Sequence, residues 1–145
     1  MPEGLTEGQR ESTIQVISPT PDADDQYFWD GVAAGKLLLQ RCSGCQILRQ
    51  PPSPMCPHCN SLDWDTQEAS GRAKVYSWVA SQHPTADDLT SRIVVLLDLE
   101  EGVRFVSNLV EIDLAHVRFG LDVELVFIDY QDQTLPQFRP SPGSL

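Results

Sequence analysis

The 145-residue sequence has no long hydrophobic run and few basic residues, and both shortages exclude classes of protein. No apolar stretch approaches the roughly 20 residues that a membrane-spanning helix needs. The first fifteen residues lack the basic start and apolar segment of a secretory signal peptide, so we expect a cytoplasmic protein. With 10 Lys and Arg against 21 Asp and Glu, the net charge of -11 argues against a nucleic-acid surface, because phosphate binding requires an excess of cations.

The familiar catalytic motifs are absent as well. The sequence has no glycine-rich phosphate loop, no Gly-x-Ser-x-Gly nucleophile motif and no His-Glu-x-x-His pair. Of the three histidines, His58 lies between two cysteines, and we interpret His83 and His116 as a surface or cap residue each rather than as general bases. The sequence therefore predicts a protein that binds rather than one that catalyses.

The charges are unevenly distributed along the chain. Residues 1–30 hold seven acids and one arginine, and residues 87–132 hold eleven acids and three arginines. Residues 31–86 reverse the sign with five cations against three acids, so a site for a small anion is expected there, although solvated surface charge explains the same pattern. The five cations are Lys36, Arg41, Arg49, Arg72 and Lys74.

All four cysteines lie close together, in two Cys-x-x-Cys pairs separated by ten residues: Cys42, Cys45, Cys56 and Cys59. Each pair can supply two thiolates from one tight turn, and tetrahedral zinc takes four such ligands. We expect Gly44 to adopt a left-handed backbone in the first turn and Pro57 to stiffen the second. The spacing predicts a rubredoxin-like ribbon around a structural zinc, in which His58 is not a ligand.

Two other uses of the cysteines remain open at this point. Iron fits the same four-sulfur geometry. A thioredoxin-like redox role is disfavoured, because neither pair opens a helix after a parallel strand. A closed site with four thiolates leaves no position for water or substrate, so the metal is expected to stabilise structure and to do no chemistry.

The residues before the cysteines fall into two parts. Residues 1–20 lack any periodicity and predict a flexible tail, whereas residues 21–36 predict a helix that Asp22 can cap and Gly35 can end. The helix carries three consecutive aromatic residues, Tyr27, Phe28 and Trp29. They offer more apolar surface than a short helix can bury on itself, so we expect contact with the protein's own core or with a second protein.

The rest of the chain predicts β structure. The ribbon should span residues 37–69, with strands in "KLLLQRC" and "QILRQ". Residues 70–140 contain five alternating or β-branched segments and one helical turn near Asp113, followed by a tail at 141–145. The five segments are residues 71–80, 91–99, 103–110, 120–130 and 134–140. Three strands, a helical turn and two more strands are the order of a five-stranded OB-fold barrel.

The segments "YFWDGVAAGKLLLQRCSGCQILRQPPSPMCPHCNS", "SGRAKVYSW", "VVLLDLEEGVRFVSNLV", "RFGLDVELVF" and "LPQFRP" follow one another in an order that resembles a known family. It is the acyl-CoA-associated family of zinc-ribbon OB-fold proteins, long catalogued as a domain of unknown function. The resemblance covers Gln26 to Pro140. It implies a mainly β protein made of an N-terminal helix, a rubredoxin-like zinc ribbon and a C-terminal OB-fold barrel.

The resemblance also assigns individual residues. The four cysteines fall on the family's metal ligands, and Phe28 and Trp29 fall on its helix. Gly102, Gly120 and Phe138 fall on its barrel turns and its closing strand. Asn60 and Ala73 stand where the family often has glycine, which puts only the local turn geometry in question.

The function that the resemblance implies is that of an accessory subunit. Family members work beside thiolase-like enzymes, among them acetyltransferases, thiolases and retro-aldolases that shorten steroid side chains, and help to form the channel for acyl-CoA. We therefore expect a free-standing, non-catalytic subunit of a hetero-oligomer. Its partner contacts are expected at Tyr27, Phe28 and Trp29, and its CoA contacts at the five cations of residues 31–86.

Two other functions are alternatives. The resemblance also implies that some family members are fused or bound to hydratases with the MaoC-like fold, so an accessory subunit of an acyl-CoA hydratase is one alternative. A module for single-stranded nucleic acid is the other, because Tyr76 and Trp78 could stack on bases. The net charge opposes this second alternative.

Overall fold

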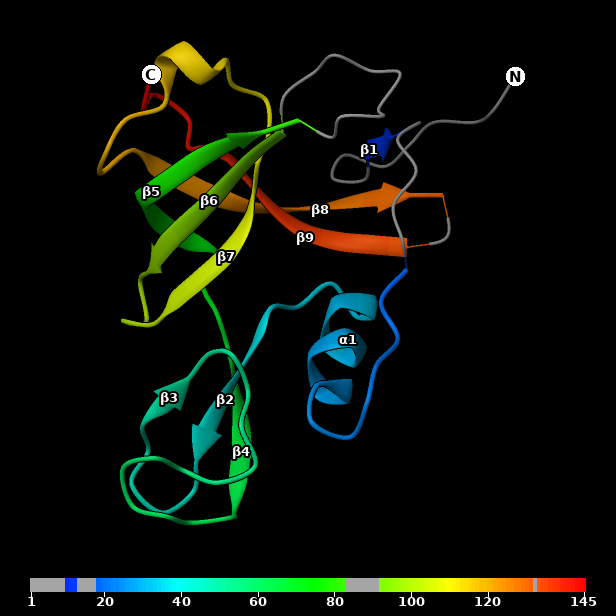
Figure 1. Cartoon of the computed structure of the whole chain (residues 1–145), viewed down its shortest axis with the longest axis vertical. Coiled ribbons are helices and arrows are strands. Elements are labelled where there is room, and N and C mark those ends of the chain that lie inside the picture. Colours follow the sequence, from blue (N-terminus) through cyan, green and yellow to red (C-terminus); the bar gives the residue numbers. More distant parts are fainter. Residues whose placement is uncertain (1–9, 13–17, 83–91, 132) are drawn as a thin grey trace. The chain divides into compact units, whose positions relative to one another are not determined.

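A computed structural model describes residues 10–12, 18–82, 92–131 and 133–145. The chain divides into two compact units (Figure 1). The first comprises residues 1–69 and 127–136, and the second comprises residues 70–126 and 137–145. None of the helices in the described part of the chain is long and apolar enough to cross a membrane.

In the first unit, helix α1 (Gln26–Ala33) begins four residues after the predicted cap, Asp22. The Asp22 carboxylate instead accepts hydrogen bonds from the backbone N–H groups of Asp24 and Asp25, in the turn that precedes the helix. Gly35 ends α1 as predicted, since its φ of 73° and the bond from Lys36 N–H to the Gly31 carbonyl form a Schellman motif.

Helix α1 is followed by a small antiparallel sheet in the order β3–β2–β4. Strand β2 (Leu38–Cys42) is central, and it pairs with β3 (Leu48–Arg49) and β4 (Trp64–Glu68). The predicted strands before and after the first cysteine pair are present, whereas β4 was not predicted. Leu37 and Leu39 are buried and belong to the hydrophobic core of this unit. The absence of a side chain at Gly31 allows Leu38 to pack closely against α1.

The second unit contains most of a five-stranded barrel, and residues 127–136 of two of its strands belong to the first unit. Strands β5 (Arg72–Ser81), β6 (Arg92–Leu99) and β7 (Arg104–Leu109) form an antiparallel meander, and the helical turn η1 (Leu114–His116) precedes β8 (Asp122–Tyr130) and β9 (Gln133–Pro140). The order β8–β5–β6–β7–β9 is closed by the pairing of β8 with β9, and β7 runs parallel to β9. This is the topology of an OB-fold, and the predicted fold class is confirmed.

The barrel core is clearest along β6, where buried and less buried residues alternate strictly. On β6, every second residue from Ile93 to Leu99 is buried, because side chains in a strand point alternately to opposite faces. Phe138 of β9 is 0% exposed and packs its ring 6.2 Å from that of Phe105. Gly102 and Gly120 occupy turns at positive φ, where a side chain would be strained.

Both expected tails contain ordered structure where they are described. Arg10–Ser12 form β1, which pairs in parallel with residues 128–130 of β8, and residues 1–9 and 13–17 of the predicted flexible tail lie outside the described residues. At the other end, the Ser141 N–H donates to the Asp122 carbonyl, and the Arg118 guanidinium donates to the Ser144 carbonyl. These bonds hold residues 141–145 on the barrel.

Candidate metal centre

Two turns of matching geometry present the four cysteines. In the first, the Gln46 N–H donates to the Cys42 carbonyl at 2.9 Å, and the Cys42 N–H donates to the Ile47 carbonyl. In the second, Asn60 and Cys56 make a bond of the same kind, also at 2.9 Å. The two turns therefore share the same backbone hydrogen bond, and each supplies two cysteine sulfur atoms.

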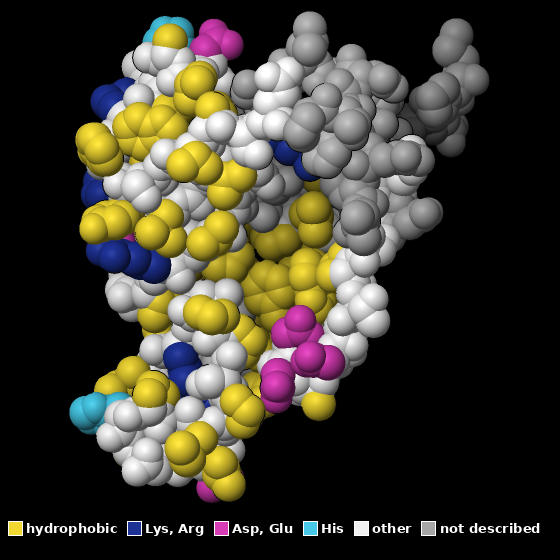
Figure 2. Space-filling model, viewed as in Figure 1, with side chains coloured by type: hydrophobic (Ala, Val, Ile, Leu, Met, Phe, Trp, Pro, Cys, Tyr) yellow, Lys and Arg dark blue, Asp and Glu magenta, His cyan; other side chains and the backbone are white. Residues whose placement is uncertain are grey.

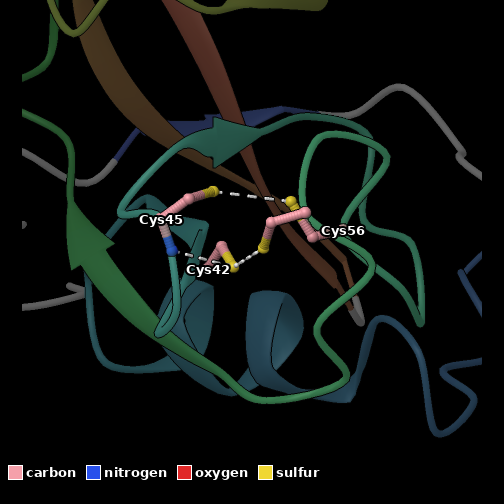
Figure 3. A group of neighbouring side chains, drawn as sticks. Cys42, Cys45 and Cys56 are labelled. Atoms are coloured by element: carbon pink, nitrogen blue, oxygen red, sulfur yellow. Dashed lines mark hydrogen bonds between the residues drawn. The ribbon is translucent and has the colours of Figure 1, made fainter.

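The sulfur atoms of Cys42, Cys45 and Cys56 point toward one another (Figure 3), and all four cysteine sulfurs lie within 4.8 Å of each other. The Sγ atoms of Cys42 and Cys59 are 3.5 Å apart, and those of Cys45 and Cys56 are 3.6 Å apart. A regular tetrahedron with zinc–sulfur bonds of about 2.3 Å has sulfur–sulfur edges of about 3.8 Å. The donor set therefore fits tetrahedral zinc, and His58 is exposed and outside the group.

The pKa values of the thiols diverge within each turn. The N–H of Cys45 lowers the pKa of Cys42 to about 6, and the N–H of Cys59 lowers the pKa of Cys56. The N–H of Ile47 also acts to lower the pKa of Cys45, but burial and the neighbouring sulfurs outweigh it and raise this pKa to about 12. Four thiols this close together do not readily ionise at the same time, because their negative charges repel one another. A bound divalent cation offsets that repulsion and stabilises all four thiolates.

One sequence prediction about the turns is wrong. Gly44 does not have a positive φ; that conformation occurs at Gln46 and Asn60, the residues directly after each pair, with φ of 64° and 62°. Asparagine tolerates the left-handed region well, which accounts for its place in the second turn. A Cβ on Gly44 would lie 3.4 Å from the Cys59 Sγ and 3.7 Å from the Cys42 Sγ, so glycine keeps space beside the sulfurs.

A buried polar network holds the loop that joins the two turns. The side-chain carbonyl of Gln40 accepts hydrogen bonds from Arg49 Nε and from the backbone N–H of Ser53, both at 2.9 Å. Arg49 Nη2 donates to the Ser53 carbonyl, also at 2.9 Å. Gln40 and Arg49 are buried, so both backbone groups of Ser53 are fixed inside the ribbon. Sequence analysis did not identify Gln40, because nothing in a single polar residue of a strand signals its burial.

Replacing Gln40 with leucine is expected to destabilise the ribbon by about 1–3 kcal/mol for each buried donor left without an acceptor. The donors are Arg49 Nε and Ser53 N. Guanidinium unfolding and the rate of zinc transfer to a chelator measure the effect, and transfer should become faster. Gln67→Leu on β4 is the matched control, since the Gln67 side chain has no hydrogen bond to any described residue. Equal transfer rates in the two variants would contradict the role of the network.

The cations predicted to contact CoA lie in different surroundings. In the first unit, Lys36 is exposed, and Arg49 is buried in its hydrogen-bonded network with Gln40 and Ser53. Arg41 donates two hydrogen bonds of 2.8 Å to the Asp65 carboxylate, and this pairing lowers the pKa of Asp65. In the second unit, Arg72 pairs with a glutamate and Lys74 with an aspartate, at the surface. Contact of these residues with CoA stays a prediction.

The three aromatic residues of α1 differ in exposure. Phe28 is buried, whereas Tyr27 and Trp29 keep part of their surface in solvent. The Tyr27 ring packs 5.0 Å from that of Trp64 on β4, and burial raises the pKa of Tyr27 to about 12. The helix therefore packs on the ribbon through Tyr27, and its contact with a partner stays a prediction.

Comparison with known families divides the chain between residues 65 and 66, four residues before the boundary between the two structural units. Residues 29–65 match "ChsH2, rubredoxin-like zinc ribbon domain", and residues 66–128 match "ChsH2, C-terminal OB-fold domain". Among solved structures, a chain of "Ltp2-ChsH2(DUF35) aldolase" is similar with a TM-score of 0.80 and 39% identity, over 85% of this chain and 98% of that one.

Two curated relatives are considerably longer than the region they share with this chain. A "Probable enoyl-CoA hydratase alpha subunit" from Thermomonospora curvata is 39% identical over 92% of this chain and 43% of its own length. The "3-oxo-4,17-pregnadiene-20-carboxyl-CoA hydratase alpha subunit" of Mycobacterium tuberculosis is 35% identical over 86% of this chain and 40% of its own length. The chain thus spans less than half of these two proteins.

Proposed function

Because this chain belongs to the ChsH2 family of DUF35 proteins, with its zinc ribbon and OB-fold domain, we propose that it is a non-catalytic subunit of a thiolase-fold enzyme that acts on acyl-CoA thioesters. The subunit would bind the enzyme and complete its channel for CoA and the acyl chain. We place the complex in the cytoplasm as part of the same proposal.

The observation that carries this proposal is the similarity to the chain of the Ltp2–ChsH2 aldolase. The similarity extends over 98% of that chain, so nearly all of the aldolase chain has a counterpart in this protein. Its name joins ChsH2 to a second protein, Ltp2, in one aldolase. A retro-aldolase that shortens a side chain carried as a CoA thioester is therefore the reaction class that we favour.

The zinc in this proposal is structural. Cys42, Cys45, Cys56 and Cys59 would hold it, and a closed set of four thiolates supplies no open coordination position for substrate. The metal would fix the two turns and the loop between them, as the Gln40–Arg49 network does from within. Catalytic groups would then come from the partner enzyme.

Co-expression with the Ltp2 of the solved aldolase tests the proposal. With an affinity tag on Ltp2 only, we expect this chain to elute with Ltp2 through affinity and size-exclusion steps at a constant ratio. Separate elution of the two proteins at micromolar concentration would contradict it.

A second candidate partner is favoured by the names of the longer relatives. Both are alpha subunits of acyl-CoA hydratases, so the chain could serve a hydratase of the MaoC-like fold. Repeating the co-expression with a tagged MaoC-like hydratase subunit separates the two candidates. Elution with the hydratase alone would replace the first proposal by the second.

A further inference from the structure

The barrel of the second unit carries apolar side chains on its outside as well as in its core. The outer barrel face, as we name it, consists of the outward-pointing residues of β5 from Lys74 onward, of β6 and of β7. Figure 2 shows hydrophobic side chains and Lys or Arg side chains together over the part of the molecule where Figure 1 draws these strands.

The strand register aligns the apolar residues of this face into two cross-strand rows. Val94 on β6 is paired with Val79 on β5 and with Asn108 on β7. Leu96, the next outward residue of β6, is paired with Val106 on β7 and with Ser77 on β5, so each row holds two apolar residues and one polar residue. Val106 is 65% exposed and Val79 is 60% exposed. Contiguous apolar side chains on a sheet surface are a usual mark of an interaction site.

An irregularity in β5 adds an aromatic residue to one end of the rows. The register shifts between Val75 and Ser77, which leaves Tyr76 as the extra residue of a β-bulge. The Arg104 guanidinium lies over the Tyr76 ring at 3.7 Å and donates to the Asp98 carboxylate at 3.0 Å. Tyrosine and arginine are the residue types that contribute most to binding at protein interfaces.

The charge of this face is opposite to that of the whole chain. The outer barrel face carries three cations, Lys74, Arg92 and Arg104, against one acid, Asp98. Lys74 is also paired with Asp122 of β8, so a positive excess remains after both acids are counted. A chain with a net charge of -11 thus presents a slightly positive apolar surface.

These features select among possible occupants. Two copies of the chain would bring their positive faces together, which disfavours a dimer through this surface. Nucleic acid would meet mainly aliphatic side chains, which do not stack on bases, because Arg104 covers one side of the Tyr76 ring, and the negative charge of the whole chain would repel it. A different protein whose apolar contact residues are bordered by carboxylates matches both the rows and the charge.

We propose that the outer barrel face, centred on Val79, Leu96 and Val106, is a docking surface for the partner enzyme, through an apolar patch bordered by acidic side chains. The inference rests on the proposed function, because it names the surface that the partner uses. Arg92 and Arg104 contact the acidic border, and the apolar residues of the two rows contact the apolar centre.

The test measures binding of this chain to the Ltp2 of the solved aldolase by titration calorimetry. Val106→Glu puts a carboxylate in the centre of the face and should weaken binding by about tenfold or more, the effect of removing one central contact. Leu114→Glu is the matched control, since Leu114 is 44% exposed and lies in η1, outside the face. Arg92→Glu should weaken binding and reduce its dependence on salt.

The possible outcomes separate this inference from the proposed function. If the wild-type chain binds Ltp2 and Val106→Glu does so as tightly, the inference is overturned and the proposed function stands. If the wild-type chain does not bind Ltp2, both are overturned. Dimers of the wild-type chain that Val106→Glu dissociates in sedimentation would replace the partner by a second copy. Equal melting temperatures of the two glutamate variants show that a loss of binding is not a loss of fold.

Discussion

Cys56→Ser is expected to lose its zinc and to unfold the ribbon, with the metal content falling from about one zinc per chain to almost none. Serine oxygen is a poor substitute for one of four thiolates, and the buried Cys56 lies where both turns meet. In zinc-finger peptides the metal contributes about 10–16 kcal/mol of folding free energy, so binding and local folding are one equilibrium.

Elemental analysis of freshly purified, reduced protein measures this directly, and it also separates zinc from iron. His58→Ala is the matched control, because His58 lies in the same turn and outside the sulfur group. The control should keep its zinc. Zinc retained by Cys56→Ser, or wild-type protein that binds no metal, would contradict the assignment of the site.

Phe138→Ala is expected to have the largest effect on the barrel, with a loss of about 3–5 kcal/mol of unfolding free energy from the cavity that it leaves. The Phe138 side chain is fully buried at the parallel pairing of β9 with β7, next to the Phe105 ring. For a domain of this size such a loss lowers the melting temperature by about 10 °C or more.

Phe119→Ala makes the same substitution at a site that is 75% exposed. Phe119 packs only against Trp78 among the rings of the described chain, with centroids 4.9 Å apart, so little apolar area is returned to water. Its effect should stay within about 1 kcal/mol. Similar losses in the two variants, measured by denaturant unfolding, would show that Phe138 does not anchor the core.

Features set by local chemistry could be predicted from the sequence. The two Cys-x-x-Cys pairs determined the metal centre, and Gly35 ended the helix through its own backbone conformation. The apolar, β-branched run of β6 predicted a strand, but because residues 93–97 are all apolar, only the structure shows which of them point into the barrel. The resemblance to the zinc-ribbon OB-fold family is confirmed by the match to its domains.

Features that depend on contacts between residues distant in sequence could not be predicted. Strand β4 is mostly polar and forms because β2 offers it a hydrogen-bonding edge. Strand β1 has three residues, too few to show a period, and depends on β8. Arg49 was grouped with basic surface residues by its charge alone, whereas Gln40 and Ser53 make it part of a buried network.

We propose that this chain contributes no catalytic group of its own and completes an enzyme on another subunit. The most direct measurement is retro-aldol cleavage of a steroid side-chain CoA thioester by this zinc-loaded chain, by Ltp2 and by their mixture. We predict turnover that depends on the mixture and none with this chain alone. Robust turnover by this chain alone, with partner protein excluded by mass spectrometry, would contradict the account.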